Sequence, residues 1–213
     1  PQLHSASRNP SPHSAPHHTM PAHIPAPGES ATDFTLVTTT GQPVTLSSHR
    51  GSKNVLLAFF PLAFTSTCTT ELCSFTEDYA AFESKGVVVI PISVDAVPSL
   101  KAFKEKLNIG PDLASDFRRD VARAYGVLND EKFFANRAYF LIDKQGIVRW
   151  AHVEKLNLER RENAEILAEV TRAQEWPATV EIGEDSEDVL ADYYRLQPPD
   201  TLAKRLPRRR NRS

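Results

Sequence analysis

The chain has 213 residues, a formal net charge of -2 and two cysteines. That length holds one domain of ordinary size with tails, and a domain of about 150 residues buries roughly 68–70% of its unfolded surface, which makes a structural metal or disulfide unnecessary. The near-neutral charge argues against general binding of nucleic acid or anionic membranes, and two cysteines in so long a chain exclude an extracellular disulfide scaffold.

Residues 1–27 are rich in Pro, Ser, Ala and His and hold almost no large apolar side chains. This composition cannot offset the entropy of ordering, so we expect a disordered N-terminal extension. The histidines of this segment are not accompanied by cysteines at the spacing of a metal site, so they indicate no metal site. Residues 1–26 also lack the apolar centre of a signal peptide, and no apolar run approaches the roughly 18 residues of a membrane span, so the expected location is the cytoplasm. Met20 is the single methionine, which suggests Met20 as the natural start and residues 1–19 as upstream sequence.

Residues 28–175 carry the apolar segments and turn residues of one folded domain. Two short strands at 34–37 and 44–46 flank a turn at Thr40 and Gly41. Further strands are expected at 55–60, 87–94, 139–142 and 147–151, and helices at 66–84, 98–107, 119–125 and 161–173. The last two strands form a hairpin whose turn includes Gly146. Strands that alternate with helices and end in a hairpin predict an α/β fold with a central mixed sheet covered by helices on both faces.

Residues 176–213 form a charged C-terminal tail with an acidic block followed by a basic one. Most such runs are solvated, although opposite charges allow the tail to fold back on itself or to pair between subunits. The basic end raises nucleic acid as a less favoured partner, testable by salt-sensitive retention on DNA. The blocks contain six charges each: Glu181, Glu184, Asp185, Glu187, Asp188 and Asp192, then Lys204, Arg205, Arg208, Arg209, Arg210 and Arg212.

Cys68 lies just after the apolar run at 55–60, in the sequence Pro-Leu-Ala-Phe-Thr-Ser-Thr-Cys that begins at Pro61. The run reads as a buried strand, so Cys68 falls in the first turn of a helix that begins near Thr65 or Ser66. The free N–H groups and the dipole of that turn favour a thiolate over a thiol. The sequence therefore predicts a nucleophilic sulfur.

Pro61, Thr65 and Cys68 match the P-x-x-x-T-x-x-C pattern of peroxiredoxins, and Arg137 matches an arginine that these enzymes carry on a later strand. Between about residues 27 and 170 the chain resembles this family, and the segments that begin at Ala31, Gly51 and Ala124 are also similar. The resemblance implies a thioredoxin-like fold and a thiol-dependent peroxidase. It also implies that no metal, haem or flavin cofactor is needed.

The resemblance assigns a catalytic role to each matched residue, and three of these residues also have a structural alternative. Cys68 attacks the peroxide, the Thr65 hydroxyl bonds the attacked oxygen, and Arg137 stabilises the thiolate and the transition state. Pro61 shields the sulfur. The structural alternatives are a side-chain helix cap for Thr65, a strand terminator for Pro61 and a plain salt bridge for Arg137.

Glu71 stands three residues after Cys68, close to the same helix face. It is a candidate partner of Arg137, although a glutamate in the first turn of a helix is also stabilised by the helix dipole.

Cys73 decides the subtype within the family. Its spacing resembles the peroxiredoxin-Q group, also called bacterioferritin comigratory protein, in which the second cysteine resolves the sulfenic acid. Residues five apart in an ideal helix have Cα atoms roughly 8.7 Å apart, whereas a disulfide tolerates at most about 7 Å, so a bond to Cys68 requires local unwinding. The surrounding sequence also resembles the one-cysteine alkyl hydroperoxide reductase E group, in which Cys73 would be a buried structural residue.

The expected reaction is the reduction of hydrogen peroxide or organic hydroperoxides, followed by recycling with thioredoxin, a glutaredoxin-like protein or a small thiol. A thiol–disulfide oxidoreductase is disfavoured because Cys-x-x-Cys is absent. A redox sensor or chaperone with little peroxidase activity remains the non-enzymatic alternative. The resemblance allows either a monomer or a homodimer.

Overall fold

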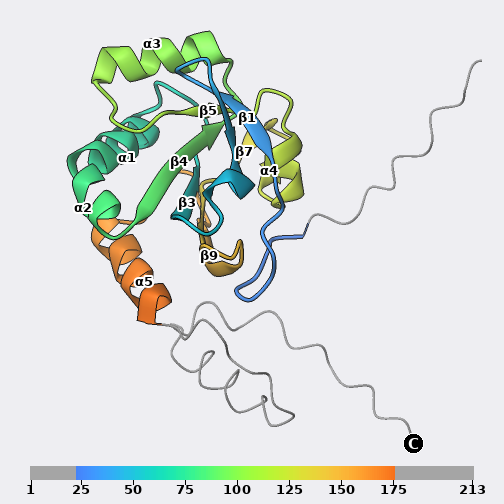
Figure 1. Ribbon diagram of the computed structural model, residues 1–213. Coiled ribbons are helices and arrows are strands. Elements are labelled where there is room, and N and C mark those ends of the chain that lie inside the picture. Colours follow the sequence, from blue (N-terminus) through green and yellow to red (C-terminus); the bar gives the residue numbers. More distant parts are fainter. Residues whose placement is uncertain (1–22, 176–213) are drawn as a thin grey trace, which may run out of the picture. The chain divides into compact units, whose positions relative to one another are not determined.

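The computed structural model describes residues 23–175 (Figure 1). Its main sheet has seven strands in the order β2-β1-β5-β4-β3-β8-β9. These strands are β1 (Thr35–Thr38), β2 (Pro43–Thr45), β3 (Asn54–Phe59), β4 (Val87–Ser93), β5 (Ala114–Ser115), β8 (Ala138–Ile142) and β9 (Val148–Val153). Two further strands, β6 (Leu128–Asn129) and β7 (Phe134–Ala135), pair with each other.

The centre of the sheet is mixed. Strand β3 runs parallel to β4 and antiparallel to β8, and β8 forms an antiparallel hairpin with β9. Residues 55–59 of β3 are at most 1% exposed, as are the five residues of β8. A strand buried on both faces needs a continuous apolar run, which is why residues 55–60 could be recognised as a strand.

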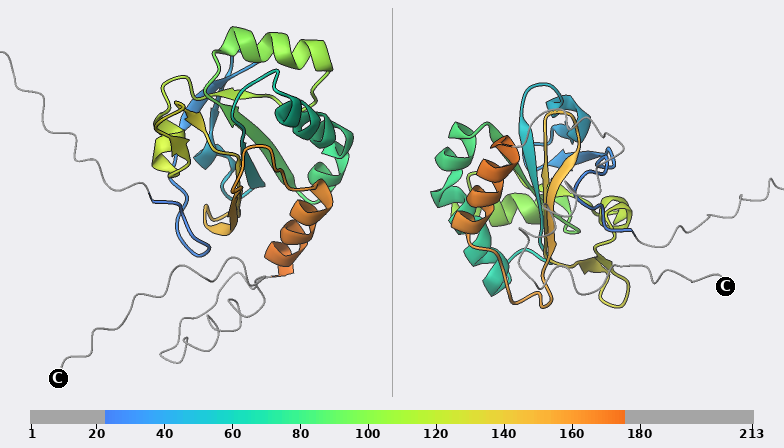
Figure 2. Two further views of the ribbon diagram at one scale, coloured as in Figure 1. Left: turned by 180° about the vertical axis from the view of Figure 1, so that it is seen from behind. Right: turned by 90° about the horizontal axis from the view of Figure 1, so that it is seen from below.

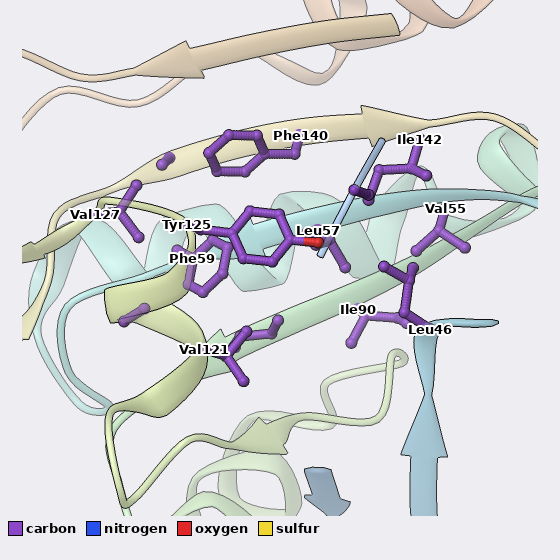
Figure 3. Packing of buried hydrophobic residues seen from close by; sticks show 14 of the residues in the cluster. Leu46, Val55, Leu57, Phe59, Ile90, Val121, Tyr125, Val127, Phe140 and Ile142 are labelled. Atoms are coloured by element: carbon purple, nitrogen blue, oxygen red, sulfur yellow. The ribbon is translucent and has the colours of Figure 1, made fainter. Parts of the chain in front are cut away.

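Alternate residues of the central strands enter two separate hydrophobic cores. Leu57 and Phe59 pack with Phe140 of β8 and with Tyr125, which follows α4 (Asp120–Ala124) (Figure 3). Leu56 and Ala58 belong to the other core. Four helices cover this face of the sheet (Figure 2). Those helices are α1 (Ser66–Glu77), α2 (Tyr79–Ser84), α3 (Val97–Leu107) and α5 (Asn163–Glu175). The predicted α/β architecture with helices on both faces of a mixed sheet is confirmed.

The helix expected at 66–84 is wrong in one respect, because Asp78 divides it into α1 and α2. Asp78 has φ -97° and ψ 10°, outside helical geometry. Its carboxylate accepts a 2.9 Å hydrogen bond from the side-chain amide of Asn163, at the start of α5. The partner comes from 85 residues away, so no local pattern could reveal the break.

The ordered domain begins before residue 28, which corrects the expectation of disorder through residue 27. Ile24 packs against the core that contains Tyr125. Gly126 has φ +65°, and a Cβ there would lie 2.8 Å from the carbonyl oxygen of His23, so the two segments are in close contact. The expectations for residues 1–22 and for the charged tail at 176–213 lie outside the described residues. No helix between residues 23 and 175 has the length and apolar character to span a membrane.

Candidate active site

The loop between β3 and α1 carries the first predicted residues. Pro61 is buried and directly follows Phe60, whose N–H still bonds the carbonyl of Ile92. The N–H of Ala63 donates to Asp95 Oδ2 at 2.9 Å. Phe64 adopts φ +63°, an unusual conformation for a residue with a side chain, and its ring packs on Phe103 with centroids 4.8 Å apart. The loop is therefore held from the neighbouring strand and from α3 before the helix begins.

Thr65 occupies the N-cap position of α1, but its side chain does not cap the helix. The hydroxyl donates instead to the carbonyl of Leu62 at 3.0 Å, which corrects the expectation of a side-chain cap. Thr65 is exposed, and a hydroxyl that donates one hydrogen bond keeps two lone pairs as acceptors.

Cys68 and Arg137 meet in the interior. Cys68 lies in the first turn of α1 and is 1% exposed, while Arg137 lies immediately before β8 and is fully buried. Arg137 Nη2 donates to Cys68 Sγ across 3.2 Å. Asn157 fixes the arginine twice, because its side-chain oxygen accepts from the Arg137 N–H at 2.9 Å and its carbonyl accepts from Nη2 at 3.2 Å. The sulfur thus faces a guanidinium that is held in place.

Glu71 completes the buried cluster. It is 2% exposed, and its Oε2 accepts a hydrogen bond from Arg137 Nη1. Its other oxygen, Oε1, accepts from the Tyr139 hydroxyl at 2.5 Å. Burial raises the pKa of Glu71 to about 7, although Arg137 and the Tyr139 hydroxyl act in the opposite direction. The expected pairing of Glu71 with Arg137 is therefore present, and this carboxyl titrates near neutral pH.

Comparisons of sequence and fold with known proteins identify the family of this chain. The model of the AhpC/TSA family matches residues 27–151, more than half of the chain. The chain belongs to the AhpC/TSA family of peroxiredoxins. Peroxiredoxins are thiol-dependent peroxidases, so this protein is one as well.

Individual relatives support the assignment. Alkyl hydroperoxide reductase E of Mycobacterium tuberculosis is 41% identical over 130 residues, which cover 60% of this chain and 85% of that protein. Among solved structures, the reduced 2-Cys peroxiredoxin of Plasmodium vivax is 32% identical with a TM-score of 0.64, over 69% of this chain and 95% of that one. Peroxidoxin BcpB of Mycobacterium tuberculosis is 27% identical with a TM-score of 0.64, over 70% and 98%. The thioredoxin-like fold implied by the sequence is confirmed.

Cys73 of this peroxiredoxin lies in α1 together with Cys68. Both cysteines are free thiols, and Cys73 is half-buried. Five residues of regular helix separate their Cα atoms by roughly 8.7 Å, beyond the reach of a disulfide. The two sulfurs can therefore join only when part of α1 unwinds.

Three residues of the site were missed by sequence reasoning: Tyr139, Asn157 and Asp95. Tyr139 had a usable signal, because residues two apart on a strand share a face and Arg137 was already a candidate. Asn157 lies in a segment outside helices and strands, where no periodicity exists. Between residues 23 and 175, no cluster of three or more His, Cys, Asp or Glu side chains is placed to hold a metal ion.

Proposed function

We propose that Cys68 is the peroxidatic thiol of this enzyme. The thiolate attacks the hydrogen-bearing oxygen of HO–OR, an S–O bond forms, the O–O bond breaks, and the leaving RO⁻ takes up a proton to give ROH. Cys68 is oxidised to a sulfenic acid while the peroxide is reduced. The observation that carries this proposal is the 3.2 Å contact between Arg137 Nη2 and Cys68 Sγ, because a fixed cation beside the sulfur stabilises its anionic form.

Thr65, Arg137 and Pro61 support that attack. The Thr65 donor is engaged by Leu62, so its free lone pairs suit the O–H of the incoming peroxide. The Arg137 Nε is buried without a hydrogen-bond partner within the described part of the chain, which leaves a donor for charge that develops on the peroxide oxygens. Pro61, in the loop between β3 and α1, is buried and has no backbone N–H to donate, so its ring restricts access of water to the sulfur.

Organic hydroperoxides fit the surroundings of the site as well as hydrogen peroxide does. Leu156 and Leu158 are 60% and 80% exposed and flank Asn157, the residue that holds Arg137. Phe64, four residues before Cys68, is 53% exposed. Apolar side chains that remain exposed next to a reactive centre gain free energy by covering an alkyl chain.

Cys73 then resolves the sulfenic acid. Its thiolate attacks the Cys68 sulfur, the S–S bond forms and hydroxide leaves, to be protonated to water. The first five residues of α1 are Ser, Thr and Cys, all weak helix formers, whereas the second half is tied down by the Thr76 hydroxyl, which accepts from the Gly110 N–H at 3.0 Å. Unwinding from the N-terminal end is therefore the easier path to the disulfide.

The disulfide is reduced by exchange with a dithiol protein, such as thioredoxin or a glutaredoxin-like protein, or with a small thiol. The one-cysteine mechanism, with Cys73 as a structural residue, differs only in that the external thiol attacks the Cys68 sulfenic acid directly. Both recycling routes operate in a reducing compartment such as the cytoplasm.

Stopped-flow consumption of hydrogen peroxide tests the proposal. We expect a second-order rate constant far above that of free cysteine at the same pH, and its complete loss in Cys68→Ser. A wild-type rate no faster than that of free cysteine would overturn the assignment and favour a redox sensor or chaperone.

A further inference from the structure

Tyr139 contacts the buried cluster of Cys68, Arg137 and Glu71 through Glu71 and not through the sulfur. Arg137 and Tyr139 are two residues apart on an extended segment, so both side chains point toward α1. Cys68 and Glu71 are three residues apart on the facing side of that helix. Tyr139 is fully buried and has two hydrogen bonds: its O–H donates to Glu71, and its oxygen accepts from the N–H of Arg161 at 3.2 Å.

The two oxygens of Glu71 are divided between two donors. Tyr139 takes Oε1, and Arg137 Nη1 takes Oε2. A carboxylate with both oxygens available binds an arginine through two parallel hydrogen bonds, which would engage a second guanidinium nitrogen. Because Tyr139 occupies one oxygen, Arg137 makes a single contact with Glu71. Its Nη2 is left to donate one N–H to Cys68 and the other to the Asn157 carbonyl.

We propose that Tyr139 is a positioning residue of this peroxidase, whose hydroxyl restricts Glu71 to one contact with Arg137 and thereby reserves one N–H of Arg137 Nη2 for the Cys68 sulfur. The proposal rests on Cys68 being the attacking thiol, and it adds a residue that acts through Glu71 and Arg137.

The charge state of Glu71 depends on the same hydroxyl. Two charged groups besides Arg137 act on Glu71: Glu154, immediately after β9, and Arg160, in the segment before α5. Cys68 lies on the same helix as Glu71. Burial raises the pKa of Glu71, and the Tyr139 hydrogen bond opposes that rise. Removal of the hydroxyl therefore raises this pKa further, so that more of Glu71 is protonated at pH 7. In the fraction that stays ionised, the freed oxygen competes with Cys68 for Arg137 Nη2.

Tyr139→Phe tests the proposal, with Tyr125→Phe as its matched control. Tyr125 is also fully buried, but its hydroxyl donates to the Thr32 carbonyl at 2.8 Å in the other core. We expect Tyr139→Phe to lower the second-order rate constant for hydrogen peroxide at least tenfold at pH 7 and to move the acid limb of its pH profile to higher pH. Tyr125→Phe should change neither.

A double-mutant cycle separates positioning from a structural role. In a Glu71→Gln background the titrating carboxylate is gone, so Tyr139→Phe should change the rate constant less than twofold. An equal loss in both backgrounds, or a Tyr139→Phe variant that behaves like Tyr125→Phe, would overturn the proposal.

A second substitution keeps the test decisive if Tyr139→Phe does not fold. Replacing Tyr139 by 3-fluorotyrosine strengthens the hydroxyl as a donor, so the acid limb should move to lower pH; an unchanged limb contradicts the proposal. If Cys68→Ser still consumes peroxide at the wild-type rate, the assignment of the thiol has failed, which is a different outcome from either result at Tyr139.

Discussion

Arg137 and Cys68 are 69 residues apart in sequence, yet the guanidinium Nη2 lies 3.2 Å from the sulfur, and both side chains are at most 1% exposed. A buried arginine is costly unless its charge is paired and most of its N–H groups are hydrogen-bonded. Glu71 supplies the opposite charge, and Asn157 accepts two further hydrogen bonds. The position of the cation is thus determined by several partners, of which the thiol is one.

Arg137→Lys should lower the second-order rate constant for hydrogen peroxide by about 10²-fold, because an ammonium group cannot reach Glu71 and Cys68 with the fixed fork of a guanidinium. Stopped-flow mixing with peroxide measures the rate, and thermal unfolding checks that the variant is folded. A folded variant with a rate constant within twofold of wild type would show that the fork is dispensable.

Glu71→Gln should change how stability depends on pH. The pKa of Glu71 rises from 4.5 in the unfolded chain to about 7 in the folded protein, so between these pH values the folded protein holds a proton that the unfolded chain has released. The free energy of unfolding of the wild type therefore falls as pH rises through this window, by about 3 kcal/mol in total from this group. The glutamine variant lacks this contribution.

Urea denaturation at pH 5, 6, 7 and 8 measures the difference between the two proteins. The wild type minus Glu71→Gln difference in unfolding free energy should decrease from pH 5 to 7 and then level off. A difference that is independent of pH would mean that the folded protein does not hold this carboxyl in its protonated form.

Cys73→Ser should permit one rapid turnover and then depend on an external thiol, because Cys68 keeps its sulfenic acid when no second thiol is present. Peptide mapping after one equivalent of hydrogen peroxide should show a disulfide between residues 68 and 73 in the wild type. A stable sulfenic acid on Cys68 with free Cys73 in the wild type would instead support the one-cysteine mechanism.

Asp95→Ala should slow the reaction by loosening the loop that precedes α1. Asp95 Oδ2 accepts hydrogen bonds from the Ala63 N–H at 2.9 Å and from the Ser93 hydroxyl at 2.8 Å. Bonds to a charged acceptor contribute about 1.5–3 kcal/mol each, so we expect a rate loss of about tenfold together with lower stability. Asp95→Asn keeps an acceptor oxygen and should retain more of the rate; equal rates in both variants and the wild type would exclude this role.

Leu158→Ser should alter the choice of substrate. The side chain is 80% exposed, so the change should leave stability within about 0.5 kcal/mol. We expect the rate constant for cumene hydroperoxide to fall severalfold while that for hydrogen peroxide stays constant. Parallel changes for both peroxides would argue against a contact with the alkyl group.

The parts of the fold that sequence could predict are those with a local cause. The apolar run that ends at Phe60 gave β3, and helix spacing gave the pairing of Glu71 with Arg137. The break at Asp78 and the order of residues 23–27 depend on partners far along the chain, which no local pattern contains. A threonine at an N-cap position usually accepts from a helix amide, whereas the Thr65 hydroxyl only donates to the Leu62 carbonyl, and this depends on loop geometry that the sequence does not reveal.

Arg137 precedes a strand that is hydrogen-bonded on both sides and buried along its whole length, whereas Cys68 sits at the weakly held end of a helix. Oxidation would therefore displace one partner and leave the other where it was. Once the proposed disulfide is reduced, the stationary guanidinium would again offer a hydrogen-bond donor to the returning sulfur, and only the first turns of α1 would have to refold for the next cycle.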